Sequence, residues 1–274
     1  METAEVTLTA SSRRDPIKVV FLGDLHLGNA ATDEKLIEQA ANRLRAKDTY
    51  WVDLGDACDF INMSDPRFDP RGLPDWVAVG DLADLPRVQV ARYAEIFQPV
   101  ADKCLARLCG NHEDVLSRHY ERDVYGELNR ALGLPPDRAL GYSGFLRLRV
   151  ARKGGADCWT LTCFLHHGAG GGALAGSKAL RLERLPASYQ ADIYAVGHTH
   201  TKMVLLKRRL GIDTKRMRLK ERPLVMLNVG AWMRAEGAGY AERAGLYPQG
   251  LGPVELWLWP AKGQDSEQIM KVVQ

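Results

Sequence analysis

The segment IKVVFLGDLHLG, residues 17–28, sets a pattern that returns along the chain. Its largely apolar first half is typical of a buried strand, and its second half carries polar side chains between glycines. The next residues, 33–47, place apolar side chains at helical spacing. The order strand, polar cluster, helix is typical of an α/β protein.

Four further segments end an apolar run in a polar cluster. They are TYWVDLGDACD at 49–59, CLARLCGNHED at 104–114, WTLTCFLHHGAGGG at 159–172 and ADIYAVGHTH at 191–200. Helices are expected near 87–103 and 176–186, and Pro186 is expected to help end the second. Loops at the carboxyl ends of strands in an open α/β sheet line a common crevice. We therefore expect the five polar clusters to converge.

The remaining segments are expected to belong to, or flank, a single domain. Residues 1–15 are expected to form a polar N-terminal tail and residues 16–274 a single domain. The segment 61–86 is rich in Pro, Asp and Gly and is expected to be a surface insertion, either a lid or a contact between protomers. Residues 201–222 are expected to form a basic hairpin that turns near 211–213, with nine Lys or Arg against two acids in 202–222.

Composition narrows the class of protein but not its chemistry. Apolar residues make up 46% of the 274 and charged residues 26%, which is typical of a globular protein. A formal net charge of +3 predicts no strong overall attraction to nucleic acid or membranes. The five cysteines are odd in number and contain no C-x-x-C pair, so reduced core thiols are expected. With no apolar segment for secretion or membrane spanning, we expect a cytoplasmic location.

Histidines gather in the polar clusters. Asp24 and His26 stand two positions apart at a strand end, as do His198 and His200, so each pair points to one side. One such pair is weak support for a metal site, because polar pairs at strand ends more often form caps or turns. The chain has seven histidines, and six of them fall in four of these clusters: His26, His112, His166, His167, His198 and His200. Scattered structural histidines would not gather in this way.

The residue types in these clusters predict a metal site. Imidazole and carboxylate groups suit manganese, iron, zinc or nickel. The candidate ligands are Asp24, His26, Asp56, Asn111, His167, His198 and His200, which are too many for one tetrahedral ion. Two ions roughly 3.5–4 Å apart, sharing a carboxylate and a hydroxide, would use the set and clamp a phosphoryl group. Two divalent cations, two carboxylates and one hydroxide leave a net charge of about +1, which favours an anionic substrate.

Five motifs carry a resemblance to a known family. They are G-D-L-H at 23–26, G-D-A-C-D at 55–59, G-N-H-E at 110–113, H-H-G at 166–168 and G-H-T-H at 197–200. In order and spacing they resemble the calcineurin-like metallophosphoesterases, and L-N-V-G at 227–230 is similar to the closing N-x-G turn of that family. The resemblance implies an α/β (α+β) fold of four layers, an αββα sandwich of two mixed sheets flanked by helices. It also implies two divalent metal ions, with manganese expected and iron, zinc or nickel as alternatives.

The resemblance implies a role for each motif residue. Asp24, His26 and His200 would hold the first ion, Asp56 would bridge, and Asn111, His198 and one of His166 or His167 would complete the second. His167 is preferred because the family's ligand in this block commonly precedes glycine directly. His112 would bind no metal but would protonate the leaving oxygen, with Asp59 accepting from its other ring nitrogen. Glu113 is expected to be structural, and Asp59 could instead only cap a turn.

The expected reaction is hydrolysis of a phosphate ester by a hydroxide that bridges the ions. The basic segment 202–222 favours a phosphodiesterase acting on nucleic acid or nucleotides. Lys178, Arg181 and Arg184 add a basic helix face beside the site, next to a glycine-rich segment that does not match a P-loop. A phosphomonoesterase such as a phosphoprotein phosphatase is the alternative enzyme, and a non-catalytic binding scaffold is the alternative from another class. The sequence leaves the oligomeric state open, and no membrane partner is expected.

Overall fold

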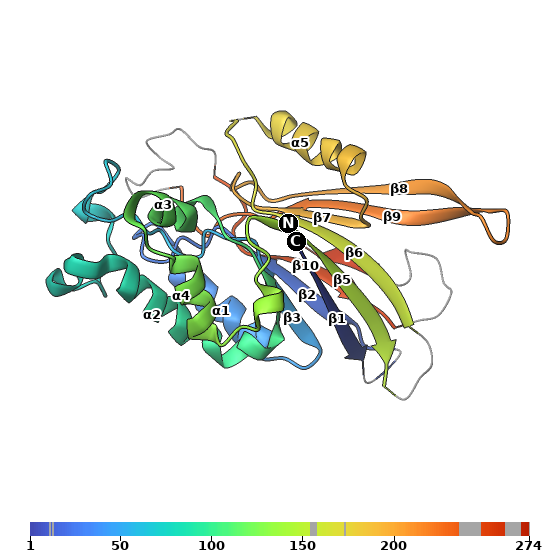
Figure 1. Ribbon diagram of the computed structural model, residues 1–274, viewed down its shortest axis with the longest axis horizontal. Helices are drawn as coiled ribbons and strands as arrows, with labels where there is room; N and C mark the ends of the chain where they lie inside the picture. Colours follow the sequence, from blue (N-terminus) through green and yellow to red (C-terminus); the bar gives the residue numbers. More distant parts are fainter. Residues whose placement is uncertain are drawn as a thin grey trace.

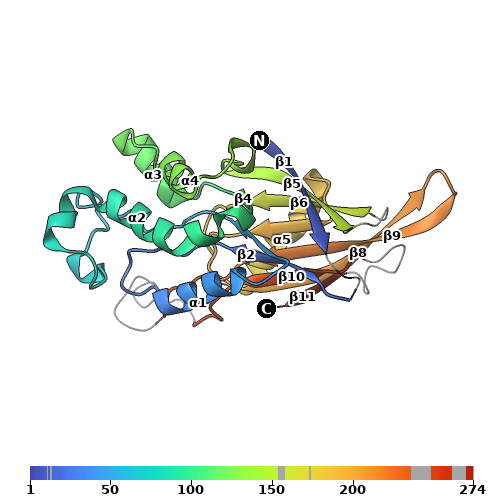
Figure 2. The ribbon, with the colours of Figure 1, turned by 90° about the horizontal axis from the view of Figure 1, so that it is seen from below.

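The computed structural model describes residues 1–10, 12, 14–153, 158–172, 174–235, 248–260 and 270–273. In this part of the chain, the strands form a six-stranded sheet in the order β1-β5-β6-β7-β9-β8 and a five-stranded sheet in the order β11-β10-β2-β3-β4. Both sheets mix parallel and antiparallel neighbours. Helices cover the two outer faces, so the fold has four layers (Figures 1 and 2). The αββα sandwich expected from the sequence is confirmed.

The five-stranded sheet has three parallel strands at its centre and edge. Strands β2 (Ile17–Leu22), β3 (Thr49–Asp53) and β4 (Cys104–Arg107) run parallel, and β10 (Val254–Leu258) and β11 (Met270–Val273) complete the sheet antiparallel. The helices on its side of the molecule are α1 (Glu34–Leu44), α2 (Leu85–Phe97), α3 (Asn111–Tyr120) and α4 (Val124–Leu132). Their apolar faces form one buried cluster with the outer face of this sheet.

The six-stranded sheet carries the second half of the chain. Its strands are β1 (Glu2–Ala10), β5 (Ser143–Arg152), β6 (Cys158–His166), β7 (Ile193–Val196), β8 (Met203–Asp213) and β9 (Arg218–Asn228). Its outer face is covered by α5 (Ala175–Ser188), with Leu182 packed against Phe164, Tyr194 and Met226. The β8–β9 hairpin extends past the rest of the molecule in both views (Figures 1 and 2).

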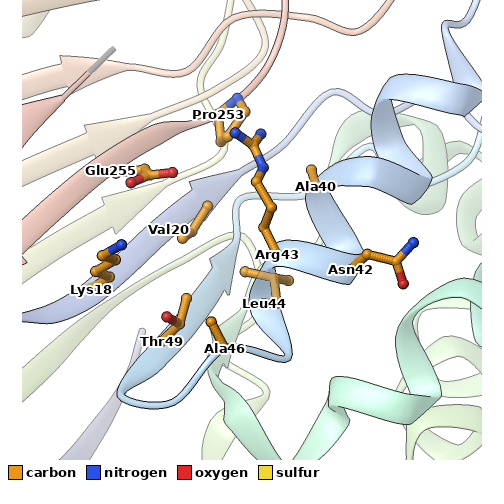
Figure 3. A pocket seen from close by; sticks show the side chains of 10 residues that line it. All are labelled: Lys18, Val20, Ala40, Asn42, Arg43, Leu44, Ala46, Thr49, Pro253 and Glu255. Atoms are coloured by element: carbon orange, nitrogen blue, oxygen red, sulfur yellow. The ribbon is translucent and has the colours of Figure 1, made fainter.

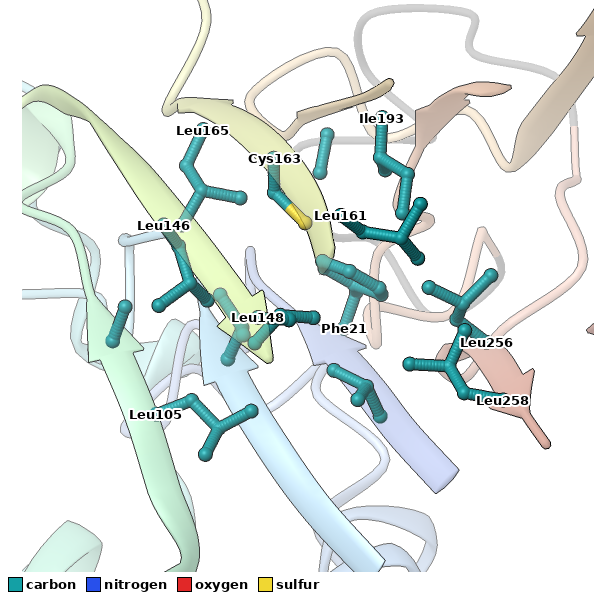
Figure 4. Close-up of a cluster of buried hydrophobic side chains, with 14 of the residues drawn as sticks. Phe21, Leu105, Leu146, Leu148, Leu161, Cys163, Leu165, Ile193, Leu256 and Leu258 are labelled. Atoms are coloured by element: carbon teal, nitrogen blue, oxygen red, sulfur yellow. The ribbon is translucent and has the colours of Figure 1, made fainter. Parts of the chain in front are cut away.

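The main hydrophobic core lies between the two sheets. Alternate side chains of each strand point inward, as expected for stacked sheets. Phe21 of β2, Leu148 of β5 and Leu256 of β10 are completely buried there (Figure 4). This core holds the carboxyl ends of strands from both sheets at one end of the sandwich. Among the described residues, no helix is both long and apolar enough to cross a membrane.

Four expectations about local structure need correction or refinement. Residues 2–10 are not a polar tail but strand β1, which pairs in parallel with β5. Its alternate residues Ala4 and Leu8 are buried, so a period-two pattern outweighs the polar composition. The basic hairpin turns at residues 214–217, after the expected turn, because β8 and β9 pair through Asp213 and Arg218. Helix α5 continues two residues past Pro186, to Ser188.

The fourth refinement concerns the segment 61–86, which holds two short 3-10 helices, Pro70–Gly72 and Val79–Asp84, before α2 begins at Leu85. Trp76 donates a hydrogen bond of 2.8 Å to Glu34, so the segment is anchored to the first turn of α1. Among the cysteines, Cys58, Cys104 and Cys163 are free and buried, and Cys109 is free and partly buried. The side chain of Cys158 lies outside the described residues.

Candidate metal centre

The polar clusters converge at one end of the sandwich. Those that follow β2, β3 and β4 come from the five-stranded sheet, and those that follow β6 and β7 come from the six-stranded sheet. The expected convergence is therefore observed, although it joins two sheets rather than one. All seven predicted ligand residues lie in it: Asp24, His26, Asp56, Asn111, His167, His198 and His200.

One group of possible ligand atoms comes from Asp24, His26 and His200, whose ligand atoms all lie within 4.8 Å of one another. The Nε2 atoms of His26 and His200 face each other at 3.1 Å. His200 Nε2 lies 4.0 Å from Asp24 Oδ1. Asp24 and His26 are buried, and the His200 side chain is 23% exposed, so this group is open to solvent on the His200 side.

A second group comes from Asp56, His167 and His198, with Asn111 between them. His167 Nε2 lies 3.3 Å from Asp56 Oδ2 and 3.0 Å from Asn111 Oδ1. The same Asn111 oxygen lies 2.7 Å from His198 Nδ1. Asn111 is the first residue of α3, so the helix start directs its amide at the two imidazoles.

The carboxylate of Asp56 lies between the two groups. Its Oδ2 atom is 3.3 Å from His167 Nε2 in the second group and 3.8 Å from His26 Nε2 in the first. Its Oδ1 atom accepts a hydrogen bond of 2.9 Å from the backbone N–H of His112, which fixes the orientation of the carboxylate. Asp56 therefore has the position that a bridging ligand requires.

The donor set fits two transition-metal ions. Two neutral imidazole nitrogens that face each other, as in His26 and His200, can form only one hydrogen bond, whereas both lone pairs can bind a common cation. In the second group, His167 Nδ1 lies 2.7 Å from the Leu54 carbonyl, which is the hydrogen bond that leaves Nε2 to bind a metal. Imidazole and carboxylate donors suit manganese, iron, zinc or nickel and do not distinguish among them.

Backbone strain is concentrated at the predicted ligands. Five of the seven have a positive φ between 48° and 68°, a region that residues with a Cβ atom rarely adopt: Asp24, His26, Asp56, His198 and His200. Strain of this kind costs roughly 1–3 kcal/mol per residue and persists where the surroundings fix it. The loops are therefore held in conformations that the sequence would not adopt locally, and the side chains are directed inward.

Glu113 has the structural role expected for it, and it holds together two of these loops, which the sequence did not identify. Its buried carboxylate accepts backbone hydrogen bonds from Asp56 at 3.1 Å, Ala57 at 2.9 Å and Gly110 at 2.8 Å. Glu113 is the third residue of α3, and it accepts from the N–H of the N-cap residue Gly110, which is one half of a capping box. A glutamate three residues after a helix start is the signal that could have identified this contact.

A fully buried arginine lies beside the Glu113 carboxylate. Arg107, the last residue of β4, lies 2.8 Å from Asp53 and 3.7 Å from Glu113. Tyr93 donates a hydrogen bond of 2.8 Å to the same oxygen of Asp53. Gly110 must be glycine, because a Cβ atom there would lie 2.3 Å from the backbone nitrogen of Asp56. This buried network fixes the loops that carry Asp56 and Asn111.

His112 lies beside the first group, but its contact with Asp59 differs from the expected one. Its Nδ1 atom contacts the backbone carbonyl of Asp59, and the Asp59 carboxylate is 4.0 Å away. That carboxylate lies nearer to His26 Nδ1, at 3.4 Å, and it also accepts from Asn29 at 3.3 Å. Asp59 thus positions His112 through its main chain and His26 through its side chain. The His112 ring meets the His26 ring edge-on, with centroids 4.6 Å apart.

The two neighbouring histidines at the end of β6 point in different directions. His167 is buried in the second group, whereas His166 accepts a hydrogen bond of 2.7 Å from the backbone of Gly168. His166 lines a separate small cavity of about 110 Å³ beside α5, together with Lys178 and Arg181. The geometry thus favours His167 as the ligand and leaves His166 facing this cavity.

The titratable groups of the site influence one another strongly. Burial raises the pKa of Asp24 to about 7, although His167 opposes the shift. Burial would also raise the pKa of Asp56, but His112 and His167 hold it well below its usual value. Burial and the neighbouring His26 lower the pKa of His200 well below its usual value. A cation bound here would compete with protons for the lone pairs that point inward.

A larger cavity lies elsewhere and does not touch these residues. It has a volume of about 210 Å³ and lies between the C-terminal part of α1 and strands β2 and β10 (Figure 3). Lys18, Arg43 and Glu255 line it. Lys18 stands near the start of β2, whereas the candidate site follows the end of that strand, so the two features are separate.

Comparison with solved structures gives distant likenesses. No family model matches the chain, and no curated protein matches it. A "predicted phosphoesterase" from Streptococcus pneumoniae TIGR4 has 11% identity and a TM-score of 0.34, over 94% of this chain and 97% of that one. A metallophosphoesterase from Sphaerobacter thermophilus has 12% identity and a TM-score of 0.34, over 90% of this chain and 84% of that one. Likenesses this distant carry no argument about chemistry, so the case for a metal centre rests on the geometry of the chain's own residues.

Proposed function

We propose that this chain is a metal-dependent hydrolase of phosphate esters with two divalent transition-metal ions, of which manganese is the first to test. The observation that carries the proposal is the shared position of the Asp56 carboxylate between two Asp/His groups. Two ions bound there would supply Lewis acidity for the phosphoryl oxygens and an activated water at neutral pH. The first would be held by Asp24, His26 and His200, and the second by Asn111, His167 and His198, with Asp56 shared.

The chain's own residues would orient the ester and supply a proton. His112 stands next to the first group and is held through its Nδ1 atom by the Asp59 carbonyl, so its Nε2 atom is free to face the substrate. In its protonated form Nε2 would donate to the oxygen of the leaving alcohol. His200 forms the partly exposed side of the first group, which is where the ester would approach.

A substrate panel tests the reaction class. The metal-free protein would be loaded with manganese, iron, zinc or nickel and assayed with p-nitrophenyl phosphate, bis-p-nitrophenyl phosphate, cyclic nucleotides and oligonucleotides. We expect hydrolysis to require metal and to be lost in Asp56→Asn. Preference for the monoester would favour a phosphomonoesterase. If no ester were hydrolysed with any ion, and no metal bound, the proposal would be wrong and a binding scaffold would replace it.

We further propose that the natural substrate is a phosphodiester of nucleic acid or nucleotides. The support is the outer face of the β8–β9 hairpin, which presents Lys207, Arg209, Lys220 and Arg222. Arg209 and Arg222 are cross-strand partners. Within the chain, Asp192 lies 3.5 Å from Arg222 and Glu183 lies 2.7 Å from Lys207, so acidic side chains offset part of this positive charge. A phosphate backbone along the face would add further anions beside these cations.

Charge neutralisation tests this substrate class. Oligonucleotides should bind more weakly to the triple variant Arg209→Gln, Lys220→Gln, Arg222→Gln. The slope of the logarithm of the binding constant against the logarithm of the salt concentration should fall in magnitude by about two to three. The matched control is Arg45→Gln, Lys47→Gln, which removes two exposed cations near the C-terminal end of α1. Equal affinity in the hairpin variant and the control would remove the basis for a nucleic-acid substrate, whatever the activity on small esters.

A further inference from the structure

The β8–β9 hairpin has an apolar face opposite its basic one. Direct partners in an antiparallel pair carry their side chains on the same face, and alternate residues share a face. Leu206, Leu210 and Ile212 of β8 therefore share a face with Leu219, the partner of Ile212. These side chains are 66%, 61%, 60% and 74% exposed, respectively. Four large aliphatic residues on one face of an exposed ribbon are more than isolated surface hydrophobics.

This apolar face continues the interior of the protein. Nearer the body, the same face of the hairpin carries Val204, Val225 and Leu227, which pack in the core between the two sheets. The hairpin extends past the other strands (Figures 1 and 2). On its outer part the five-stranded sheet no longer covers this face, yet the face still carries large apolar side chains like those of the core. Such a face needs a partner with a matching apolar surface.

The charges on the hairpin indicate what kind of partner fits. The opposite face is basic and would attract anions, so a nucleic acid would bind that face and leave the leucines uncovered. In the described part of the chain β8 is the edge strand of its sheet, and it carries Lys207, Arg208 and Arg209 in succession. A second strand of the same sequence along this edge would bring like charges together. The apolar face carries a charged pair, Arg208 with Glu221 at 2.8 Å. Because the pair has one positive and one negative side chain, it is complementary in charge to an identical pair on a second copy.

We propose that the apolar face of this hairpin binds the same face of a second copy of the chain, related by a two-fold axis. In such an interface each Arg208 can meet the Glu221 of the other copy, and the leucines pack against leucines. The exposed aliphatic surface is on the order of 500 Å² per copy, so a pair would bury on the order of 1,000 Å², the lower limit for a specific interface. The basic faces would point away from the contact and stay open to solvent.

Measurement of mass in solution tests this proposal. By light scattering after size exclusion, and by sedimentation at 1–100 µM, we expect a monomer–dimer equilibrium for the unaltered chain. Leu210→Glu and, on the other strand, Leu219→Lys should each shift it to monomer by at least tenfold in dissociation constant. The matched control is Leu180→Glu on α5, which is 51% exposed and lies outside this face. It should dimerise as the unaltered chain does.

Three results would overturn the proposal. The first is a monomeric unaltered chain at 100 µM, and the second is a dimer that persists in both hairpin variants. The third is a monomer that co-sediments with anionic phospholipid vesicles through these leucines, which would make a membrane surface the partner. Circular dichroism and thermal melting of each variant check that the fold is retained. If one variant fails to fold, the other, on the opposite strand, still decides the question.

Discussion

The sharpest prediction concerns Glu113, whose carboxylate joins two loops of the candidate site. In Glu113→Gln one oxygen becomes an NH₂ group, which cannot accept a hydrogen bond. The three donors are the backbone N–H groups of Asp56, Ala57 and Gly110, at 3.1, 2.9 and 2.8 Å. If the amide places its oxygen toward Asp56 and Gly110, only the Ala57 bond is lost, and the NH₂ group then faces a buried donor.

The expected loss of stability follows from this count. The buried N–H of Ala57, left without an acceptor, costs about 1–3 kcal/mol, and the two bonds that remain are weaker because their acceptor is no longer charged, so the total is about 2–4 kcal/mol. Arg107, 3.7 Å from Glu113, also loses one of its two buried carboxylate neighbours and keeps Asp53. For a protein with roughly 5–15 kcal/mol of total stability, this is a large fraction, and no change in side-chain volume contributes to it.

Guanidinium unfolding of the metal-free protein, followed by tryptophan fluorescence, measures the effect. The control is Glu121→Gln at the exposed end of the same helix, which should change stability by no more than about 0.5 kcal/mol. Because Glu113 orients the loops of Asp56 and Asn111, metal affinity should also fall by about 10–100-fold. If Glu113→Gln unfolded at the same denaturant concentration as the control, the carboxylate would not be holding the loops together.

Three further predictions concern the same site. His112→Ala should keep both metals by elemental analysis yet lose about 10²–10⁴-fold in turnover, and loss of a metal instead would make His112 a ligand. His167→Ala should lose metal whereas the matched His166→Ala keeps it, and the reverse result would exchange their assignments. Asp56 raises the pKa of His167 to about 10 against the desolvation that burial imposes, so in the metal-free protein His167 is protonated at pH 8. The folded-state pKa is raised, so this pair stabilises the metal-free fold fully below about pH 6.5 and loses its effect as the pH rises through about 10. Metal binding at pH 8 should therefore release about one proton, which calorimetry in buffers of different ionisation enthalpy would detect, and its absence would contradict the protonation state.

The sequence predicted the convergence of the polar clusters because apolar runs that end in Gly-Asp or Gly-His are visible without any structure. The predicted polar tail was wrong for β1, because the small and polar residues around Ala4, Val6 and Leu8 made their alternation hard to recognise. The sequence also did not reveal that Asp59 contacts His112 through its carbonyl, because spacing along a chain cannot tell a main-chain contact from a side-chain one. The four-layer arrangement was expected only through the family resemblance, not through the residues themselves.

The choice between His166 and His167 follows from the alternation of side chains along β6. In β6, Cys163 and Leu165 are buried between the sheets, whereas Phe164 packs on the side of α5. Continuing the alternation places His166 on the α5 side and His167 on the side of the inter-sheet core. The pattern was present in the sequence. It could be used only once the inward face of β6 was known, which is information that comes from the partner sheet.

The position of the candidate site between two sheets links its chemistry to the packing of the core. Asp24 and His26 follow a strand of one sheet, and His200 follows a strand of the other. The second group is divided in the same way, with Asp56 and Asn111 on one side and His167 and His198 on the other. Each proposed ion would therefore bridge the sheets, and its ligand distances would depend on how the inter-sheet core fixes their separation. Core residues that do not adjoin the proposed ligands in sequence, such as Leu256, would thus help to set metal affinity, because a shift of one sheet over the other would alter both groups at once.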